Sequence, residues 1–324
     1  MAGADRRILV TGSTGFVGQW AMHALHDAMP DATLVGTGTT APEGGLALDI
    51  TDTAAVDRTI RDVRPTGLLH LAAISDIPTA RQNPRLTWAV NVMGTLALAE
   101  AVRAHAPACR FVFASTGEVY GHAFKGRTTP VDESVPPDPA NPYAASKLAA
   151  EVLLAQMAHD GLDIWRFRPF NHIGPGQSER FAIASFAAQI ARIEAGLQPP
   201  EIRVGNLEAK RDFLDVRDVA AAYATALAAD GLPTPAGPLN LSSGVPRSIR
   251  TMLDALLALS PARPAVTPDP ERMRPSDVME ATGNAGRATD ILGWALRHDL
   301  DATLTDCLAG FRHPVDDPSA SSGA

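Results

Sequence analysis

The stretch Arg7–Gly18, RILVTGSTGFVG, decides the fold of this chain. Its first five residues form an apolar run that is typical of a buried strand, and the apolar periodicity after the run predicts a helix over Phe16–Met29. Between them, Gly12, Gly15 and Gly18 follow a G-x-x-G-x-x-G spacing. Glycines at such a turn let backbone N–H groups approach a pyrophosphate at the positive end of the helix. The turn therefore predicts dinucleotide binding, and the alternative is a turn that serves packing alone.

Short apolar runs alternate with longer amphipathic stretches through the first half of the chain. The expected strands are Arg7–Thr11, Thr33–Thr37, Leu68–Ala72, Arg110–Ser115 and Asp163–Arg168. The expected helices are Phe16–Met29, Asp52–Arg61, Leu86–His105 and Tyr143–His159. Strands that are continuously apolar and separated by helices indicate a parallel sheet covered on both faces. The predicted fold class is α/β, a doubly wound parallel sheet of the Rossmann type.

Glycine and proline become frequent after about residue 170, where this alternation ends. Helical periodicity persists at Ala182–Glu194, Val216–Ala229 and Ser248–Leu259. We expect residues 1–170 to form the nucleotide-binding Rossmann domain, with residues 212–242 returning to it. Residues 171–211 and 243–312 are expected to form a smaller C-terminal lobe that binds the substrate. The polar residues 313–324 are expected to be a disordered tail.

Charge and composition exclude several classes of function. The chain has 28 basic and 36 acidic residues and a net charge of −8, which argues against a nucleic-acid or anionic-membrane surface. No apolar stretch approaches the ~20 residues of a membrane span, and the residues before Gly12 do not resemble a signal peptide. Cys109 and Cys307 lie far apart, and the histidines show no metal-ligand spacing. We expect a cytoplasmic protein that binds no metal, membrane or nucleic acid.

Tyr143 and Lys147 are expected to form a catalytic pair. Asn141-Pro142 introduces the helix on which they lie, and residues four apart share a helix face. Three tyrosines and three lysines in 324 residues give this spacing by chance only about 0.03 times, so a chance surface pair is the weaker interpretation. We expect the ammonium to hold the pKa of the Tyr143 phenol well below its usual value. The phenol would then exchange a proton near neutral pH.

Thr116 and Glu118 follow directly after the expected strand Arg110–Ser115. If the backbone stays extended there, their side chains share one face. We expect Thr116 to hydrogen-bond the reacting oxygen beside Tyr143. Glu118 is either a second acid/base or a structural acceptor, and the sequence leaves both roles open.

The end of the second expected strand bears on the choice between NAD and NADP. An acidic residue there binds the ribose 2′-hydroxyl of NAD, whereas an arginine suits the 2′-phosphate of NADP. The segment Gly36–Thr40, GTGTT, has neither. Because the hydroxyls of Thr39 and Thr40 suit a phosphate, we favour NADPH over NADH. Asp49 is a candidate acceptor for the adenine amino group, and a helix N-cap is its alternative role.

Several motifs together resemble those of the extended short-chain dehydrogenase/reductases. They are the glycine triplet, His70-Leu-Ala-Ala, Asn91-Val-Met-Gly-Thr, Ser115-Thr-Gly-Glu-Val-Tyr-Gly and Tyr143-x-x-x-Lys147. Later segments are similar to the GDP-6-deoxy-D-mannose reductases, which are relatives of the GDP-mannose 4,6-dehydratases. These segments are Arg168-Pro-Phe-Asn-His-Ile-Gly-Pro-Gly-Gln, residues 204–218 and Arg274-Pro-Ser-Asp-Val. The resemblance spans about residues 7–312.

The resemblance implies a cofactor site and a substrate site. The cofactor, NADPH or NADH, would contact Gly12, Thr14, Gly15, Phe16, Val17, Gly18, Asp49, Ile50, Leu71, Ala72, Ala73, Asn91, Tyr143, Lys147 and Phe170. The substrate would contact Thr116, Asn171, Arg211, Arg274 and Asp277. Both arginines would hold a diphosphate through charge-assisted hydrogen bonds.

The implied reaction is reduction of the C4 ketone of GDP-4-dehydro-6-deoxy-D-mannose to GDP-6-deoxy-D-mannose (GDP-D-rhamnose). Tyr143 would donate the proton, and Lys147 would bind the nicotinamide ribose. A GDP-mannose 4,6-dehydratase with Glu118 as base and a nucleotide-sugar 4-epimerase are the alternative enzymes. A non-catalytic protein on the same fold would not need the tyrosine–lysine pair. The resemblance also implies a homodimer, formed through Leu86–His105 and Tyr143–His159.

Overall fold

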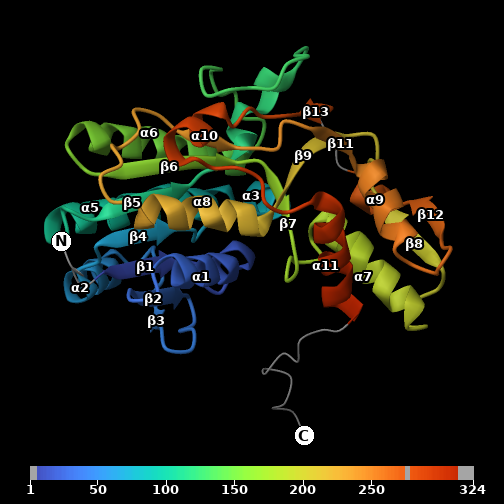
Figure 1. Ribbon diagram of the computed structural model, residues 1–324, viewed down its shortest axis with the longest axis horizontal. Helices are drawn as coiled ribbons and strands as arrows, with labels where there is room; N and C mark the ends of the chain where they lie inside the picture. Colours follow the sequence, from blue (N-terminus) through green and yellow to red (C-terminus); the bar gives the residue numbers. More distant parts are fainter. Residues whose placement is uncertain (1–5, 274–277, 313–324) are drawn as a thin grey trace, which may run out of the picture.

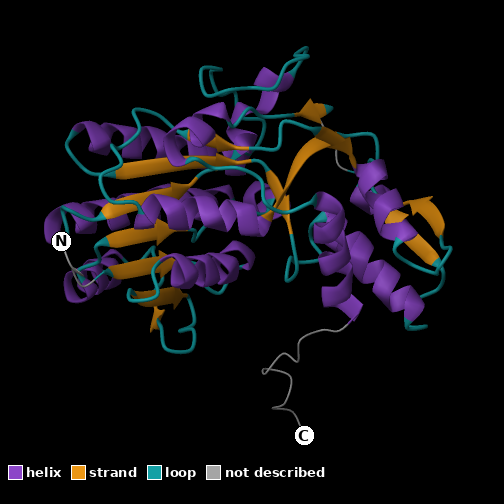
Figure 2. Ribbon diagram, viewed as in Figure 1, coloured by secondary structure: helices purple, strands orange, loops and turns teal. Residues whose placement is uncertain are grey.

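A seven-stranded sheet forms the centre of the computed structural model, which describes residues 6–273 and 278–312. Each pairing in this sheet is parallel, and the strand order is β10-β6-β5-β4-β1-β2-β3 (Figures 1 and 2). The strands are β1 (Arg7–Thr11), β2 (Thr33–Gly38), β3 (Leu46–Ala47), β4 (Gly67–His70), β5 (Arg110–Ala114), β6 (Ile164–Pro169) and β10 (Leu239–Leu241). The predicted doubly wound α/β fold is confirmed.

Helices cover both faces of this sheet. One face carries α1 (Phe16–Ala28), α8 (Val216–Ala228) and α10 (Gly286–Leu292). The other carries α2 (Thr53–Val63), α5 (Thr95–His105) and α6 (Pro142–His159). Because the strands are apolar on both sides, each face closes a separate hydrophobic core. No helix within residues 6–273 and 278–312 combines the length and the apolar composition needed to span a membrane.

A smaller lobe lies beyond the carboxyl ends of the parallel strands (Figure 1). Its strands are β7 (Asn171–Ile173), β8 (Glu201–Val204), β9 (Lys210–Asp215), β11 (Pro246–Ser248), β12 (Ala265–Pro268) and β13 (Glu280–Ala281). Its helices are α7 (Ala182–Glu194), α9 (Ile249–Ala258), η3 (Pro270–Arg272) and α11 (Leu300–Arg312). The apolar faces of α7, α9 and α11 pack together into a third core around Ile190, Leu253 and Leu308.

Part of the segment that was expected in the lobe packs on the central sheet instead. Helix α10 contacts β10 and α8, and Ala288 and Trp294 are buried in the core beneath α1 and α8. The Trp294 indole donates to the Asp218 carbonyl oxygen at 2.9 Å, which fixes the segment to α8. The segment packs on the sheet because the large Trp294 indole is buried there, and no local sequence pattern indicates this position. The expected tail, residues 313–324, lies outside the described residues.

The long helix expected over Leu86–His105 is interrupted. The structure has α4 (Pro84–Trp88), a π-helical turn η1 (Ala89–Gly94) and then α5, preceded by α3 (Ile77–Gln82). Within η1 the buried Asn91 amide accepts from the Ile74 N–H at 2.8 Å and donates to the Ser146 hydroxyl at 2.9 Å. A π-helical turn widens the helix locally. It occurs here where this polar side chain must reach two neighbouring segments.

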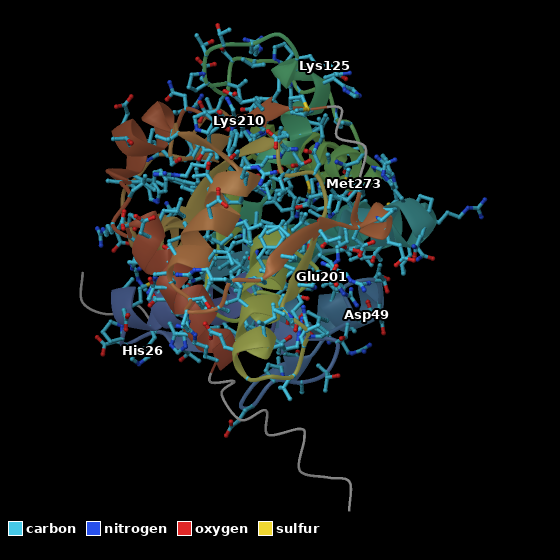
Figure 3. All side chains as sticks on the ribbon, turned by 90° about the vertical axis from the view of Figure 1, so that its right-hand side faces the viewer. His26, Asp49, Lys125, Glu201, Lys210 and Met273 are labelled. Carbon is cyan, nitrogen blue, oxygen red and sulfur yellow. The ribbon has the colours of Figure 1, made fainter. Side chains whose placement is uncertain are left out.

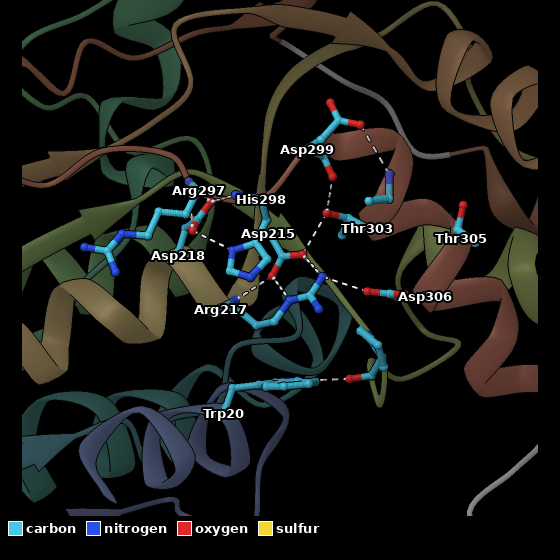
Figure 4. Close-up of polar contacts among 12 residues, drawn as sticks. Trp20, Asp215, Arg217, Asp218, Arg297, His298, Asp299, Thr303, Thr305 and Asp306 are labelled. Carbon is cyan, nitrogen blue, oxygen red and sulfur yellow. Dashed lines mark hydrogen bonds and ion pairs between the residues drawn. The ribbon is translucent and has the colours of Figure 1, made fainter. Parts of the chain in front are cut away.

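Polar contacts between α1, α8 and α11 hold the lobe against the sheet (Figure 4). The Arg217 guanidinium pairs with Asp215 at 2.6 Å and with Asp306 at 2.8 Å. It also lies over the Trp20 ring, and the Trp20 indole donates to the Pro175 carbonyl oxygen at 3.1 Å. These contacts fix the position of the lobe above the strand ends.

Candidate active site

A cleft of about 1940 Å³ lies between the carboxyl ends of the parallel strands and the smaller lobe. Pockets for one small molecule usually have about 300–1,000 Å³, so this cleft has room for a dinucleotide and a second ligand. Both parts of the molecule line it. Asp49 on the sheet side and Met273 on the lobe are lining residues and lie on the same side of the molecule in Figure 3.

The glycine turn between β1 and α1 has the geometry of a phosphate-binding turn. Gly12 has a φ of +72°, and a Cβ there would lie 2.8 Å from the Ala72 nitrogen. A Cβ on Gly18 would collide with the Gly12 carbonyl oxygen, so this glycine lets α1 start directly against the turn. Helix α1 begins after Gly15 without a capping side chain. Its first N–H groups therefore remain available for an anion at the helix N-terminus.

Most residues expected to contact the cofactor line this cleft. They are Gly12, Thr14, Gly15, Phe16, Val17, Gly18, Asp49, Ile50, Leu71, Ala72, Ala73, Tyr143, Lys147 and Phe170. Asn91 does not line it, because its amide is used to hold Ile74 and Ser146. Asn91 thus positions the segment after β4 against α6 and makes no contact with the cleft.

Asp49 is exposed at the end of the cleft near β2 and β3. One carboxylate oxygen accepts from the Thr51 N–H at 2.9 Å and from its hydroxyl at 2.7 Å. These hydrogen bonds lower the pKa of Asp49, so it stays an acceptor at neutral pH. The helix cap is Asp52, which accepts from the Ala55 N–H. Asp49 is therefore not the N-cap of α2, and its role as an acceptor for the adenine amino group stays a prediction.

Tyr143 and Lys147 lie on the first turns of α6 at the floor of the cleft. Asn141 caps this helix by accepting from the Ala144 N–H at 2.9 Å. Lys147 is 3 % exposed, and its ammonium lies 4.3 Å from the centre of the Phe113 ring on β5. The helix start places both residues at the cleft, and the aromatic contact holds the Lys147 ammonium.

Burial raises the pKa of Tyr143 to about 12, and the nearby Thr116 hydroxyl opposes this rise by hydrogen bonding. The expectation that Lys147 holds the pKa of Tyr143 below its usual value is therefore wrong for this structure. Burial disfavours the phenolate more strongly than the neighbouring groups favour it. Burial likewise lowers the pKa of Lys147 to about 7, and Glu151 opposes that fall. At neutral pH Tyr143 is a proton donor, and Lys147 is close to its midpoint.

The lowered pKa of Lys147 predicts how stability changes with pH. Between about pH 7 and its usual value of 10.5, the unfolded chain keeps a proton that the folded chain has released. The free energy of unfolding should therefore rise with pH in this range, by up to about 1.4 kcal/mol per pH unit. Lys147→Met removes this contribution. Urea unfolding at about pH 7 and about pH 9 should show the wild type gaining stability relative to this variant.

Lys210→Met is the matched control, because that lysine is half-exposed in an ion pair with Glu280. Its stability should follow that of the wild type between the two pH values. Equal pH dependence in the wild type and Lys147→Met would contradict the burial of a lysine that titrates near neutrality.

The backbone is extended at Thr116 but not at Glu118, so the condition for their side chains to share one strand face is not met. Thr116 caps the 3₁₀ helix η2 (Gly117–Phe124), and its hydroxyl accepts from the Glu118 N–H at 3.1 Å. Both residues still line the cleft, since the helix starts at the end of β5. The Asn141 amide donates to the Glu118 carboxylate at 3.3 Å. Asn141 therefore starts α6 and also orients the acidic side chain beside Tyr143.

The residues expected to bind the substrate are placed only in part. Asn171, at the start of β7, and Arg211, on β9, line the cleft from the side of the lobe. Burial lowers the pKa of Arg211 and the nearby Glu118 opposes this, so the two side chains are electrostatically coupled. Arg274 and Asp277 lie outside the described residues.

A buried ion pair next to Lys147 was not foreseen. Glu151 is 2 % exposed and lies one helical turn after Lys147. Its carboxylate accepts from the Arg168 guanidinium at 2.7, 3.0 and 3.1 Å and from the Ser115 hydroxyl. Arg168 also donates to the Tyr120 hydroxyl at 3.0 Å. The pair connects the ends of β5 and β6 to α6. Glu151 follows Lys147 by four residues, so the sequence spacing could have indicated that the two side chains share a face of α6.

The floor of the cleft also includes His172, which sequence reasoning had not singled out. Its ring stacks on Phe16 with centroids 6.2 Å apart and an angle of 9° between the planes. Burial lowers the pKa of His172, so the ring is neutral near pH 7. The stack joins the start of α1 to the lobe, and no short sequence pattern indicates it.

The model of the NAD dependent epimerase/dehydratase family matches residues 8–237. The chain is 35% identical to a GDP-6-deoxy-D-mannose reductase of Pseudomonas aeruginosa, over 93% of this chain and 97% of the relative. A solved structure of RMD from Pseudomonas aeruginosa complexed with NADPH superposes with a TM-score of 0.83 and 32% identity, covering 96% and 99% of the two chains. The UDP-glucose 4-epimerase of Thermus thermophilus in complex with NAD gives a TM-score of 0.82 at 29% identity, covering 95% and 100%.

The family match covers more than half of the chain and contains the glycine turn and the Tyr143–Lys147 pair. The described cleft joins these two motifs in one site. The chain therefore belongs to the NAD dependent epimerase/dehydratase family, within the extended short-chain dehydrogenase/reductases.

Proposed function

We propose that this protein reduces the C4 ketone of GDP-4-dehydro-6-deoxy-D-mannose to GDP-6-deoxy-D-mannose. The observation that carries this proposal is a protonated phenol, Tyr143, beside the Thr116 hydroxyl at the floor of a cleft that begins at a phosphate-binding turn. A ketone reduction needs a proton donor at the forming alkoxide, and a phenol with a raised pKa remains protonated there. The 35% identity to a GDP-6-deoxy-D-mannose reductase supports this choice of substrate.

Tyr143, Thr116 and Lys147 each have a separate role in this reduction. A bound nicotinamide dinucleotide supplies the hydride for the ketone carbon. The Tyr143 hydroxyl donates its proton to the ketone oxygen, and Thr116 hydrogen-bonds the same oxygen. Lys147, whose pKa is lowered to about 7, is charged in only part of the molecules at neutral pH, and it binds the ribose. The preorganised donors act where negative charge develops, which is the main source of acceleration in such sites.

A dehydratase is the second candidate, because Glu118 is held beside Tyr143 by Asn141. A 4,6-dehydratase first oxidises the C4 alcohol, which needs a phenolate as base, and then removes the C5 proton. Burial of Tyr143 opposes the first step and favours the reductase. Incubation with GDP-mannose and no added reductant separates the two functions. We expect no conversion, whereas a 4-keto product would establish a dehydratase.

We propose NADPH as the preferred cofactor, with hydroxyls rather than an arginine binding the 2′-phosphate. Thr39 lines the cleft after β2 and is exposed, so Thr39→Asp places a carboxylate there without steric conflict. Repulsion between this carboxylate and the 2′-phosphate should raise the Kd for NADPH about tenfold or more and leave the Kd for NADH nearly unchanged. Fluorescence titration measures both constants.

Thr40→Asp is the control for this prediction, because Thr40 is exposed but does not line the cleft. It should raise the Kd for NADPH less than Thr39→Asp does and leave the Kd for NADH nearly unchanged. A wild-type protein that binds NADH more tightly than NADPH would overturn the preference.

We also propose a homodimer that forms through α4, η1 and α6. Large apolar side chains are exposed there, including Leu86 (52 %), Met93 (57 %) and Val152 (64 %). These elements contact one another, and exposed apolar side chains on neighbouring helices are of the kind that marks association. Met93→Glu with Val152→Glu should convert a dimer to a monomer in light scattering after size exclusion. A monomeric wild type would contradict the proposal.

A further inference from the structure

The hydroxyl groups of the three tyrosines differ in their partners. Tyr120 is fully buried, and its hydroxyl accepts from Arg168 at 3.0 Å and donates to the Asn240 side chain at 2.9 Å. The Tyr143 hydroxyl interacts with Thr116. Tyr223 is 1 % exposed, yet its hydroxyl has no hydrogen-bond partner among residues 6–273 and 278–312. The residue lines the cleft, so a bound ligand or solvent molecule can reach this hydroxyl and serve as its partner.

Tyr223 lies at the floor of the cleft. Its ring packs edge-on against Phe167 of β6, with centroids 5.4 Å apart, and the residue lines the cleft. Ala114 at the end of β5 and Pro169 at the end of β6 line the same part of the sheet edge. Helix α8 thus brings a hydroxyl group to the part of the cleft that Ala114 and Pro169 line.

The same part of the floor is next to the catalytic pair. The charge that Tyr143 carries when ionised raises the pKa of Tyr223, which means that the two phenols are near each other. Burial raises the pKa of Tyr223, and Tyr143 raises it further, so the Tyr223 hydroxyl stays protonated and can donate. A dinucleotide with its pyrophosphate at Gly12–Gly18 must place its reacting end beside Tyr143. The polar substituent of that end is a carboxamide, which can accept from a hydroxyl.

We propose that Tyr223 binds the nicotinamide carboxamide and thereby orients the ring at the floor of the cleft. This inference rests on the proposed function, because it requires a nicotinamide cofactor. It adds a residue from α8, on the opposite face of the sheet from α6, to the cofactor site.

Tyr223→Phe tests the proposal, since it removes one oxygen and keeps the ring packed on Phe167. We expect the Kd for NADPH, measured by fluorescence titration, to rise roughly tenfold. The Kd for ADP-ribose 2′-phosphate, which lacks the nicotinamide, should stay the same. The thermal midpoint should not fall, because the folded protein loses no hydrogen bond of its own.

Tyr120→Phe is the matched control. It leaves Arg168 and Asn240 without their shared partner, so its midpoint should fall while its Kd for NADPH stays that of the wild type. Equal affinities of Tyr223→Phe and wild type for NADPH would overturn the inference and leave the proposed function intact. So would an equal loss of affinity for both ligands. A wild type that binds neither NADPH nor NADH would overturn the proposed function as well.

Discussion

Replacing Tyr143 with phenylalanine should lower kcat for ketone reduction by about 10²–10⁴-fold. The variant keeps the ring but loses the hydroxyl that donates the proton beside Thr116. Its affinity for NADPH should remain close to that of the wild type, because the phosphate turn and Lys147 are unchanged. Stopped-flow measurement of NADPH oxidation gives the rate, and fluorescence titration gives the affinity.

Thr116→Val is the companion variant. It removes the second hydrogen bond to the reacting oxygen, so it should lower kcat less than Tyr143→Phe does. A Tyr143→Phe variant with more than about one-tenth of the wild-type kcat would show that another group supplies the proton.

The Glu151→Gln substitution should cost about 3–5 kcal/mol in the free energy of unfolding. The carboxylate is buried with Arg168, and its loss leaves the guanidinium charge uncompensated in the interior. The substitution also removes the charge that opposes the fall in the pKa of Lys147. Urea unfolding near neutral pH measures the expected cost.

The exposed pair of Lys210 and Glu280 provides the control, since its atoms are 3.2 Å apart and both side chains are about half-exposed. Glu280→Gln should cost less than about 1 kcal/mol. A double variant, Glu151→Gln with Arg168→Met, should recover part of the stability lost by Glu151→Gln alone. Equal costs for Glu151→Gln and Glu280→Gln would mean that the buried pair contributes no more than a surface pair.

The parts of the fold that have strong local patterns could be predicted from the sequence. The apolar runs at β1 and β5 and the glycine spacing at Gly12–Gly18 each specify one local conformation, and the structure has them with boundaries within one residue. The break at η1 could not be predicted, because it depends on where the Asn91 amide finds its partners. The return of Trp294 to the central core depends on tertiary burial in the same way.

The candidate site shows the same division. Tyr143 and Lys147 share a helix face because of their spacing, which the sequence displays. Their pKa values depend on burial, which spacing does not show, and the expected direction for Tyr143 was therefore wrong. No sequence pattern indicates the unpartnered hydroxyl of Tyr223 either, since an alanine-rich helix indicates packing rather than a site.

The most direct test of the proposed chemistry uses NADPH that carries deuterium at C4 of the nicotinamide. The protein is mixed with GDP-4-dehydro-6-deoxy-D-mannose, and the product is examined by NMR. The proposed reduction predicts deuterium on C4 of the sugar and loss of the ketone, at a rate that depends on Tyr143. A sugar that keeps its ketone, or a product whose C4 hydrogen comes from water, would contradict it.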